Sequence, residues 1–361
     1  MQLRDLCFEV IQTCPNECRF CSSNSSKCET QTIPIEIFKK TIEHFMKQGG
    51  IQEISISGGE PFLHPDLFEM VRFCKEREIR TVIFTSGIKK AKPLTQEQIN
   101  YIEKECKERL EEIEQHEPEN ARLKANVRRY YERMLNRPEF SGIAREEMQQ
   151  LKSLGLDKIV FDWQAENEET DSSLMGRKNM FTYLMNSVIM AKSAGLNIDV
   201  HFVLMKPNYK QFPDILEFLE LAKIPSISIL NFVPQGRGRI NREELMLNDE
   251  ELQEFAQIVQ NAKQNYSGRI RIGIPLIGGI QHLCTAGTEK LNIKYDGTVL
   301  ACPAFKEISA ETMEKYGIRL HNIYKDLEQV VVTGGKREKP LCKQIYEFSD
   351  KIALVQKGEE R

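Results

Sequence analysis

The sequence predicts an α/β protein, built as a partial (βα)6 barrel of the TIM type with a helical insertion and a small C-terminal domain containing a β-hairpin. Strand-like runs alternate with helix-length segments, the pattern of a parallel sheet with crossover helices. Gly49-Gly50, Gly155 and Gly195 stand where helices should end before the next strand. Polar and sulfur-bearing motifs follow the strands, at the ends where barrels carry their chemistry.

Six βα units account for most of the chain. The expected strands lie at about residues 5–12, 52–57, 79–85, 157–162, 196–204 and 226–231. The expected helices lie at about residues 35–48, 65–77, 144–155, 179–194, 212–222 and 249–265. We therefore assign residues 1–265 to the barrel and 266–361 to a C-terminal domain.

Residues 89–143 depart from this alternation and predict an inserted helical hairpin. Apolar side chains recur on one helical face before Pro118 and again after it: Ile99, Ile102, Cys106, Leu110 and Ile113, then Leu123, Val127, Tyr131 and Leu135. The insertion is either a decoration on the barrel wall or a lid or docking arm near the barrel mouth, and both readings stay open.

The segment after residue 265 has a different pattern. Arg269–Ile274 is strand-like, and Asn292–Tyr295 and Thr298–Ala301 flank Asp296-Gly297, a strong hairpin signal. Cys284 precedes this hairpin and Cys302-Pro303 ends it.

Composition excludes several classes of protein. Of 361 residues, 40% are hydrophobic and 29% charged, and the net charge of −3 gives no field suited to nucleic acid. No signal peptide is visible at the N-terminus, and no run of 18 apolar residues predicts a membrane span. Ten cysteines are too sparse for a disulfide scaffold, so we expect them to stay reduced, in the cytoplasm.

Cys14, Cys18 and Cys21 form a C-x₃-C-x₂-C run directly after the first expected strand. Three thiolates on one loop can hold three corners of a [4Fe-4S] cluster and leave the fourth iron open. The alternative is a structural zinc site, but zinc usually takes four ligands from paired cysteine hooks, and the chain has no second hook.

This cysteine loop resembles that of the radical S-adenosylmethionine (radical SAM) superfamily, and Gly58-Gly59-Glu60-Pro61 after the second strand resembles its second hallmark. The resemblance implies that S-adenosylmethionine chelates the open iron and is cleaved reductively to a 5′-deoxyadenosyl radical, which abstracts hydrogen from carbon. It also implies the same six-unit partial barrel, and it implies that Gly58, Gly59 and Glu60 meet the methionine amino group. A plain turn before Pro61 is the structural alternative.

Four further residues at strand ends are candidate cofactor or substrate contacts. Ser86 ends the third strand, Asp162 and Gln164 follow the fourth, and Arg237 lies in a Pro-x-Gly-Arg segment after the sixth. The Arg237 guanidinium suits a carboxylate. For each of these residues, the alternative is a solvated side chain at a strand end or on the surface, without a functional role. We interpret His201 as a structural residue.

The C-terminal segment resembles the twitch domain, a shorter relative of the SPASM domain in the same superfamily. The matching residues are Cys284, Gly287, Tyr295-Asp296-Gly297 and Cys302-Pro303, with Cys342 as a further thiolate. The resemblance implies an auxiliary [4Fe-4S] cluster held by Cys284, Cys302 and Cys342. Either a non-cysteine group closes this site or one iron stays open to substrate, and buried cysteines without metal are the alternative.

We therefore expect a radical SAM oxidoreductase or maturase that modifies a ribosomally made peptide or protein by oxidation or cross-linking. Oxidation or cyclisation of an aminosugar or nucleotide is the enzymatic alternative, and a non-catalytic iron–sulfur sensor or electron carrier is the alternative of another class. A low-potential flavodoxin or ferredoxin is the implied electron donor. No leader-peptide-binding domain is expected before the first strand, so a separate recognition protein or the insertion would bind a peptide.

Overall fold

The computed structural model describes residues 2–136, 138–272, 284–315 and 317–336. They fall into two compact units. We call residues 1–88 and 142–361 the barrel unit, and residues 89–141 the hairpin unit.

The barrel unit is organised around one ten-stranded sheet, with strand order β12-β11-β10-β1-β2-β3-β6-β7-β8-β9. Its strands are β1 (Leu3–Ile11), β2 (Ile51–Gly58), β3 (Arg80–Thr85), β6 (Lys158–Asp162), β7 (Ile198–Leu204), β8 (Ser226–Asn231), β9 (Arg269–Ile272), β10 (Lys290–Ile293), β11 (Thr298–Leu300) and β12 (His321–Asn322). Neighbours from β10 to β9 pair in parallel, and β11 and β12 add antiparallel strands. The predicted fold class is confirmed.

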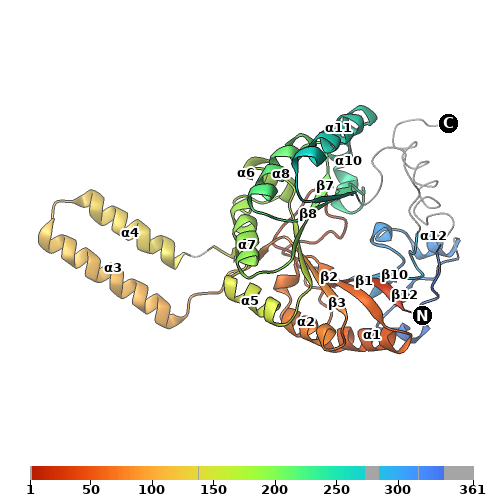
Figure 1. Ribbon diagram of the computed structural model, residues 1–361. Helices are drawn as coiled ribbons and strands as arrows, with labels where there is room; N and C mark the ends of the chain where they lie inside the picture. Colours follow the sequence, from red (N-terminus) through yellow and green to blue (C-terminus); the bar gives the residue numbers. More distant parts are fainter. Residues whose placement is uncertain (1, 137, 273–283, 316, 337–361) are drawn as a thin grey trace. The chain divides into compact units, whose positions relative to one another are not determined.

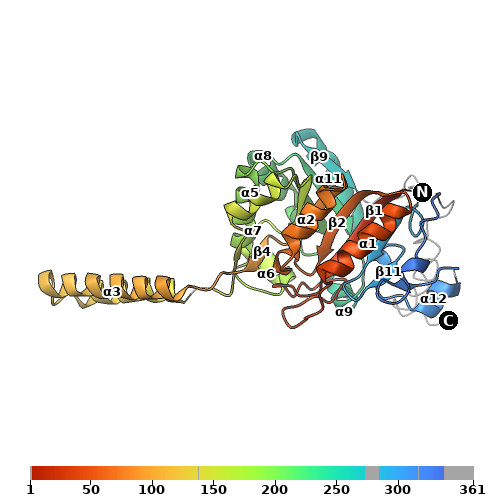
Figure 2. The same ribbon diagram turned by 90° about the horizontal axis from the view of Figure 1, so that it is seen from below.

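Crossover helices connect these strands on one face of the sheet (Figure 1). The longer helices are α1 (Ile35–Lys47), α2 (Leu67–Lys75), α5 (Arg145–Ser153), α6 (Glu168–Met175), α7 (Phe181–Ser193), α8 (Phe212–Leu221) and α11 (Asp249–Asn265). The shorter ones are α9 (Arg237–Ile240), α10 (Arg242–Leu245), α12 (Ala310–Lys315), and the 3₁₀ turns η1 (Pro61–Leu63), η2 (Tyr209–Gln211), η3 (Pro303–Phe305) and η4 (Leu327–Gln329). Figure 2 shows α1 and α2 lying over β1 and β2.

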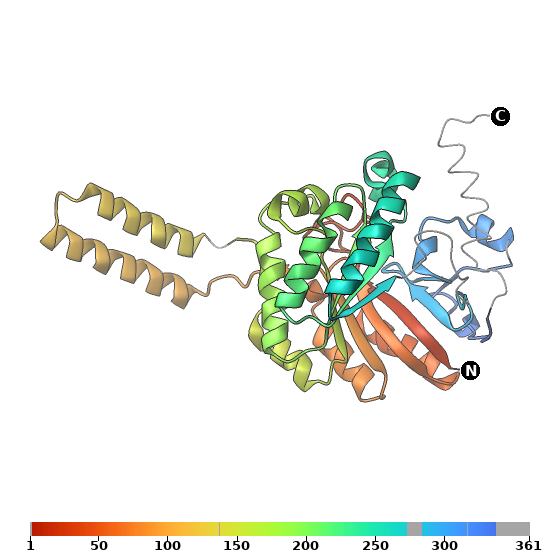
Figure 3. The ribbon, with the colours of Figure 1, turned by 45° about the horizontal axis from the view of Figure 1, so that its top comes forward.

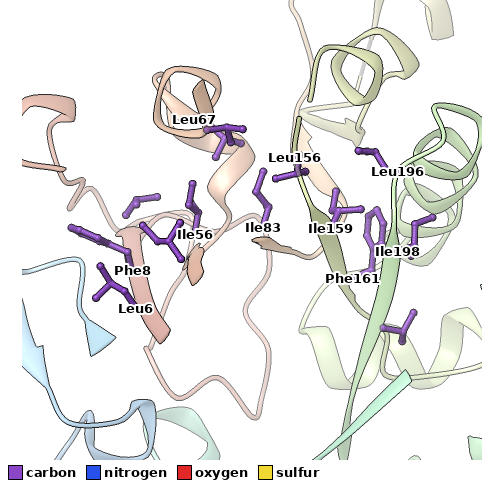
Figure 4. Packing of buried hydrophobic residues seen from close by; sticks show 14 of the residues in the cluster. Leu6, Phe8, Ile56, Leu67, Ile83, Leu156, Ile159, Phe161, Leu196 and Ile198 are labelled. Carbon is purple, nitrogen blue, oxygen red and sulfur yellow. The ribbon is translucent and has the colours of Figure 1, made fainter. Parts of the chain in front are cut away.

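The core lies between the strands and these helices because alternate strand residues point to it. Leu6 and Phe8 of β1 are fully buried, and the Phe8 ring lies 5.0 Å from the Phe38 ring of α1. Figure 4 shows apolar side chains from neighbouring strands, among them Ile56 and Ile83, with Leu67 of α2 beside them. The opposite face of the sheet includes buried polar side chains, among them Glu9, Ser55 and Ser228.

Strands of the C-terminal segment extend the barrel sheet. β10 pairs in parallel with β1, and Figure 3 shows the light blue strands beside the red first strand. The Lys290 ammonium lies 2.6 Å from Asp5 Oδ2 across this pair. The expected hairpin is present as β10 and β11, whereas Ile274 and Cys342 of the sequence predictions lie outside the described residues.

The hairpin unit contains α3 (Gln96–His116) and α4 (Ala121–Leu135), as the periodicity on either side of Pro118 predicts. Thr95 begins α3 with a capping box, and the Asn120 side chain caps α4. Where the insertion leaves and rejoins the barrel chain, β4 (Ile88–Lys90) and β5 (Phe140–Gly142) pair as a separate two-stranded sheet.

Candidate active site

The predicted site residues follow the C-terminal ends of parallel strands. Cys14 follows β1, Glu60 follows β2, Ser86 follows β3, Asp162 ends β6, and Arg237 comes after β8. Because parallel strands end at the same edge of a sheet, these residues gather at one mouth of the barrel.

The Gly-Gly-Glu segment is bound to the backbone that leads into the cysteine loop. The Gly59 amide donates to the Ile11 carbonyl at 2.6 Å, and the Glu60 amide to the Thr13 carbonyl at 2.9 Å. A Cβ on Gly58 would overlap the Ile11 carbonyl oxygen, and one on Gly59 would overlap that of Thr13. These glycines are therefore required by a close backbone-to-backbone approach, whatever they contact in a bound ligand.

The Glu60 side chain is fully buried and accepts hydrogen bonds from two neighbouring segments. The Thr85 hydroxyl donates to Oε1 at 2.7 Å, the Ser86 amide to Oε2 at 2.7 Å, and the Phe62 amide to Oε1 at 3.1 Å. The Ser86 hydroxyl also donates to Oε2. Burial raises the pKa of Glu60 to about 7, against the opposing effect of these donors. Glu60 and Ser86 thus lock the ends of β2 and β3 together.

Arg237 holds the cysteine loop. Its Nε donates to the Cys18 carbonyl at 2.8 Å, and its Nη2 donates to the Ser25 carbonyl at 2.6 Å. Its backbone amide donates to the Cys21 carbonyl at 3.0 Å. The sequence suggested that this guanidinium binds a ligand carboxylate. Among the described residues, it instead binds the backbone that carries the thiols.

Helix α6 also holds this loop, and the sequence reasoning missed it. The Glu17 amide donates to the Met175 carbonyl at 3.0 Å, and Cys18 Sγ lies 3.3 Å from Met175 Sδ. The helix has recognisable signals: the Asn167 side chain caps its start, acidic residues fill its first turn, and Gly176 ends it in the left-handed conformation.

Of the three thiols of the loop, Cys14 is buried, whereas Cys18 and Cys21 are partly exposed. Cys14 is 7% exposed, and burial raises the pKa of both Cys14 and Cys18 well above the usual value. Neighbouring thiols add to the increase, as does the Asp162 carboxylate. Thiols that disfavour one another's ionisation need a bound cationic centre to become thiolates, and iron supplies one.

Unsatisfied polar atoms around the same loop also fit a bound group. Gln12 Oε1, Asn16 Oδ1 and Ser25 Oγ are buried and have no hydrogen-bond partner among the described residues. Among the described residues, no three His, Cys, Asp or Glu side chains come close enough together to hold a single metal ion. A four-iron cluster accepts its thiolates at separate corners.

The remaining strand-end candidates have different surroundings. Burial raises the pKa of Asp162 to about 6, and its charge acts on Cys14 and Cys18. Gln164 is fully buried, and its amide bridges the β7 backbone: Nε2 donates to the His201 carbonyl, and Oε1 accepts from the Val203 amide. Asp162 thus lies close enough to Cys14 and Cys18 for its charge to act on them, whereas Gln164 holds β7.

His201 packs against Phe84 with ring centroids 4.9 Å apart. Burial lowers its pKa to about 4, so the ring is neutral near pH 7. These contacts agree with a structural histidine.

A buried ion pair connects the barrel interior, the cysteine loop and the C-terminal segment. Lys306 and Glu9 of β1 pair directly, with side chains 10% and 2% exposed. The Lys306 ammonium also donates to Ser23 Oγ at 2.7 Å and to Ser22 Oγ at 3.2 Å, directly after Cys21. No sequence motif marked this cation, which follows Cys302-Pro303 by only three residues.

Cys284 and Cys302 lie together in a small apolar cluster with Phe305 and Met313. Burial raises the pKa of Cys302, and the nearby Cys284 adds to the increase. The Gly287 amide, in the turn after Cys284, donates to the Ala301 carbonyl at 3.1 Å. The described residues therefore bring two of the predicted auxiliary ligands together.

Residues 8–104, which contain both the cysteine loop and the Gly-Gly-Glu segment, match the family model described as the radical SAM superfamily. The chain therefore contains a radical SAM domain. This match confirms the radical SAM resemblance seen in the sequence, and the family implies S-adenosylmethionine and a [4Fe-4S] cluster as cofactors.

Similarity extends well beyond this region. The PqqA peptide cyclase of Granulibacter bethesdensis is 22% identical over 309 residues, which cover 83% of this chain and 68% of that protein. Streptococcus suis SuiB bound to S-adenosylmethionine superposes with a TM-score of 0.57 at 16% identity, over 90% of this radical SAM chain and 64% of SuiB. SuiB bound to its precursor peptide SuiA gives 0.58 at 16% identity, over 94% and 66%. This enzyme thus spans about two thirds of the length of these proteins.

Among the described residues, no helix is both long and apolar enough to cross a membrane.

Proposed function

We propose that this enzyme modifies a ribosomally made peptide or protein by removing hydrogen from carbon, in an oxidation or a cross-linking reaction. The observation that carries the proposal is the similarity to a PqqA peptide cyclase over 83% of the chain. That span includes far more than the cofactor-binding motifs, so it is not explained by a shared cofactor alone. The precursor peptide seen with the structurally similar SuiB supports the same substrate class.

In this proposal Cys14, Cys18 and Cys21 hold the open-cornered cluster. When bound, the cluster and S-adenosylmethionine supply a carbon radical able to take hydrogen from an unactivated carbon. The chain's own residues position these groups. The floor of the site is formed by Gly58, Gly59, Glu60 and Ser86. Arg237 holds the cysteine loop, and Gln164 holds β7. The Asp162 carboxylate would contact the cofactor or the substrate.

We further propose an auxiliary cluster at Cys284 and Cys302, with Cys342, which lies outside the described residues, as the third ligand. It would either accept an electron from the oxidised substrate or bind the substrate. The electron donor is a low-potential flavodoxin or ferredoxin, and a separate protein or the hairpin unit recognises the peptide. We propose the cytoplasm as the compartment of the enzyme, because oxygen-sensitive clusters and reduced cysteines persist there.

The first test is anaerobic reconstitution with iron, sulfide, dithionite and S-adenosylmethionine. We expect release of 5′-deoxyadenosine, abolished by Cys18→Ala and retained by Cys28→Ala, an exposed cysteine near the same loop. Cofactor left intact by fully reconstituted, reduced protein would favour the sensor or electron carrier.

The substrate is tested with short peptides encoded beside this reading frame. A peptide that loses two hydrogens, seen as a decrease of about 2 Da by mass spectrometry, supports oxidation or cross-linking. Turnover of an aminosugar or nucleotide, with no peptide changed, would favour the small-molecule alternative.

The auxiliary site is tested by iron and sulfide content. Two clusters correspond to about eight irons, falling to about four in Cys284→Ala/Cys302→Ala. An unchanged count in that variant would remove the second site.

A further inference from the structure

The hairpin unit has a half-exposed apolar groove between its two helices. The groove, of about 490 Å³, has Cys106 and Leu110 of α3 and Tyr131 and Leu135 of α4 along its floor. All four side chains are partly exposed, and only Ile102 and Ile113 are buried within the two helices. Two helices that bury so little apolar surface have little to offset the entropy of ordering them.

Charge is divided between the two helices with opposite signs. Helix α3 has seven glutamates and three cations, a net charge of −4, whereas α4 has five cations and one glutamate, a net charge of +4. Glutamates of α3 itself pair with its cations, as in Lys104–Glu108 and Lys107–Glu111. Four arginines of α4 form no ion pair with any described residue: Arg122, Arg128, Arg129 and Arg133.

From this groove and this division of charge we propose that the hairpin unit docks onto the hairpin unit of a second copy of the chain, forming a four-helix bundle. A two-fold axis makes each α3 face the partner's α4, so acidic and basic helices meet twice. In the bundle, the apolar side chains that line the two grooves would be buried against each other and form its hydrophobic core. An acidic peptide fits less well, because α3 would repel it as strongly as α4 attracts it.

The test is the oligomeric state of the full chain, measured by sedimentation velocity over a range of concentrations. We expect a dimer that weakens as salt rises, since part of the attraction is between exposed charges. Leu110→Asp should weaken dimerisation by at least ~30-fold, because a substitution at a two-fold interface acts in both copies.

Tyr101→Asp is the matched control. It makes the same kind of change on the same helix, at a side chain that is 63% exposed and does not line the groove. This variant should dimerise like the natural chain. A second variant, with residues 95–136 replaced by a short Gly-Ser linker, should be monomeric even if Leu110→Asp perturbs the helix.

A full chain that stays monomeric up to about 100 µM would overturn the proposal. So would a dimer that survives removal of residues 95–136, because its interface would then lie elsewhere. Equal loss of dimer in Leu110→Asp and Tyr101→Asp would refute the groove as the contact. The proposal concerns assembly alone and does not depend on the substrate proposed above.

Discussion

At the scale of single residues, the Glu9–Lys306 pair ties the interior of the barrel to the C-terminal segment. Both charges are buried, and Lys306 also donates to the two serines directly after Cys21. A buried ion pair is most costly when one partner is lost, because the other charge is left without compensation.

We therefore expect Lys306→Met to lower the free energy of unfolding by about 3–5 kcal/mol in urea titration. Glu9→Gln/Lys306→Met should recover at least half of this loss, since neither charge then remains buried. Lys315→Met, an exposed lysine on α12 paired with Glu311, is the control and should change stability by less than about 1 kcal/mol. A Lys306→Met variant as stable as its control would show that the pair is not compensating a buried charge.

Asp171 on α6 gives a pH-dependent prediction. Its side chain is 2% exposed, and its Oδ1 has no hydrogen-bond partner among the described residues. Burial raises the pKa of Asp171 from 3.8 to about 7, and the negative charge of nearby Glu168 adds to the increase. Between those pH values the folded chain keeps a proton that the unfolded chain has lost. The contribution of Asp171 to stability is therefore present below about pH 4 and declines as pH rises toward 7.

Asp171→Asn removes this titration. The variant should be more stable than the natural chain by about 2–4 kcal/mol at pH 8 and should differ little from it at pH 4. Asp214→Asn, at an exposed position of α8, should show no such pH-dependent gain. Equal effects of Asp171→Asn at the two pH values would contradict the raised pKa.

Residues also differ in how far the sequence could predict them. Cys14, Cys18 and Cys21 form a local pattern, so their spacing alone suggested a cluster. The Lys306 interaction could not be foreseen, because its partners are nearly 300 residues away and its own neighbours carry no charge pattern. Arg237 was correctly singled out, yet its contacts with the Cys18 and Ser25 carbonyls depend on how two loops meet.

At the scale of elements, the join between β2 and the cysteine loop depends on the absence of a side chain. Gly59 lies outside the left-handed region, so its requirement is steric: an added Cβ would overlap the Gln12 and Thr13 carbonyl oxygens. We expect Gly59→Ala to lower the free energy of unfolding by more than about 3 kcal/mol and to reduce iron retained after reconstitution.

Gly195→Ala separates this clash from ordinary glycine effects. Gly195 has φ +73° and no atom within 4 Å of an added Cβ, so the change should cost only about 1–2 kcal/mol and leave the iron content unchanged. If Gly59→Ala behaved like Gly195→Ala, the close backbone approach would not be what positions the cysteine loop.

The elements of the barrel could be predicted because each carries its own periodicity and end signals. All six expected strands and their helices are found within a few residues of the predicted ends. Helix α6 was not predicted because its eight residues have little apolar periodicity, although Asn167 and Gly176 mark its two ends. The parallel pairing of β10 with β1 could not be predicted, since nothing local in Lys290–Ile293 specifies a partner strand near the N-terminal end of the sequence.

At the scale of the whole molecule, the insertion is a separate compact unit whose two chain ends meet. β4 pairs with β5, and the Ala91 amide donates to the Glu139 carbonyl at 2.9 Å. A short linker can therefore replace residues 95–136 with little change in the entropy of closing the loop. We expect this variant to keep the unfolding free energy of the barrel unit within about 1 kcal/mol and to keep 5′-deoxyadenosine release, because every proposed cofactor residue lies in the barrel unit.

The same variant distinguishes the two interpretations of the insertion. A decoration would leave peptide modification unchanged, whereas a docking arm would show normal cofactor cleavage in the absence of peptide together with at least ~10-fold loss of modified peptide. Point variants in the groove then distinguish dimerisation from peptide recognition by the hairpin unit. If Leu110→Asp loses the dimer but modifies the peptide fully, the hairpin unit serves assembly. Loss of cofactor cleavage itself would instead show that the barrel unit needs the insertion to fold, contrary to the division into two independent units.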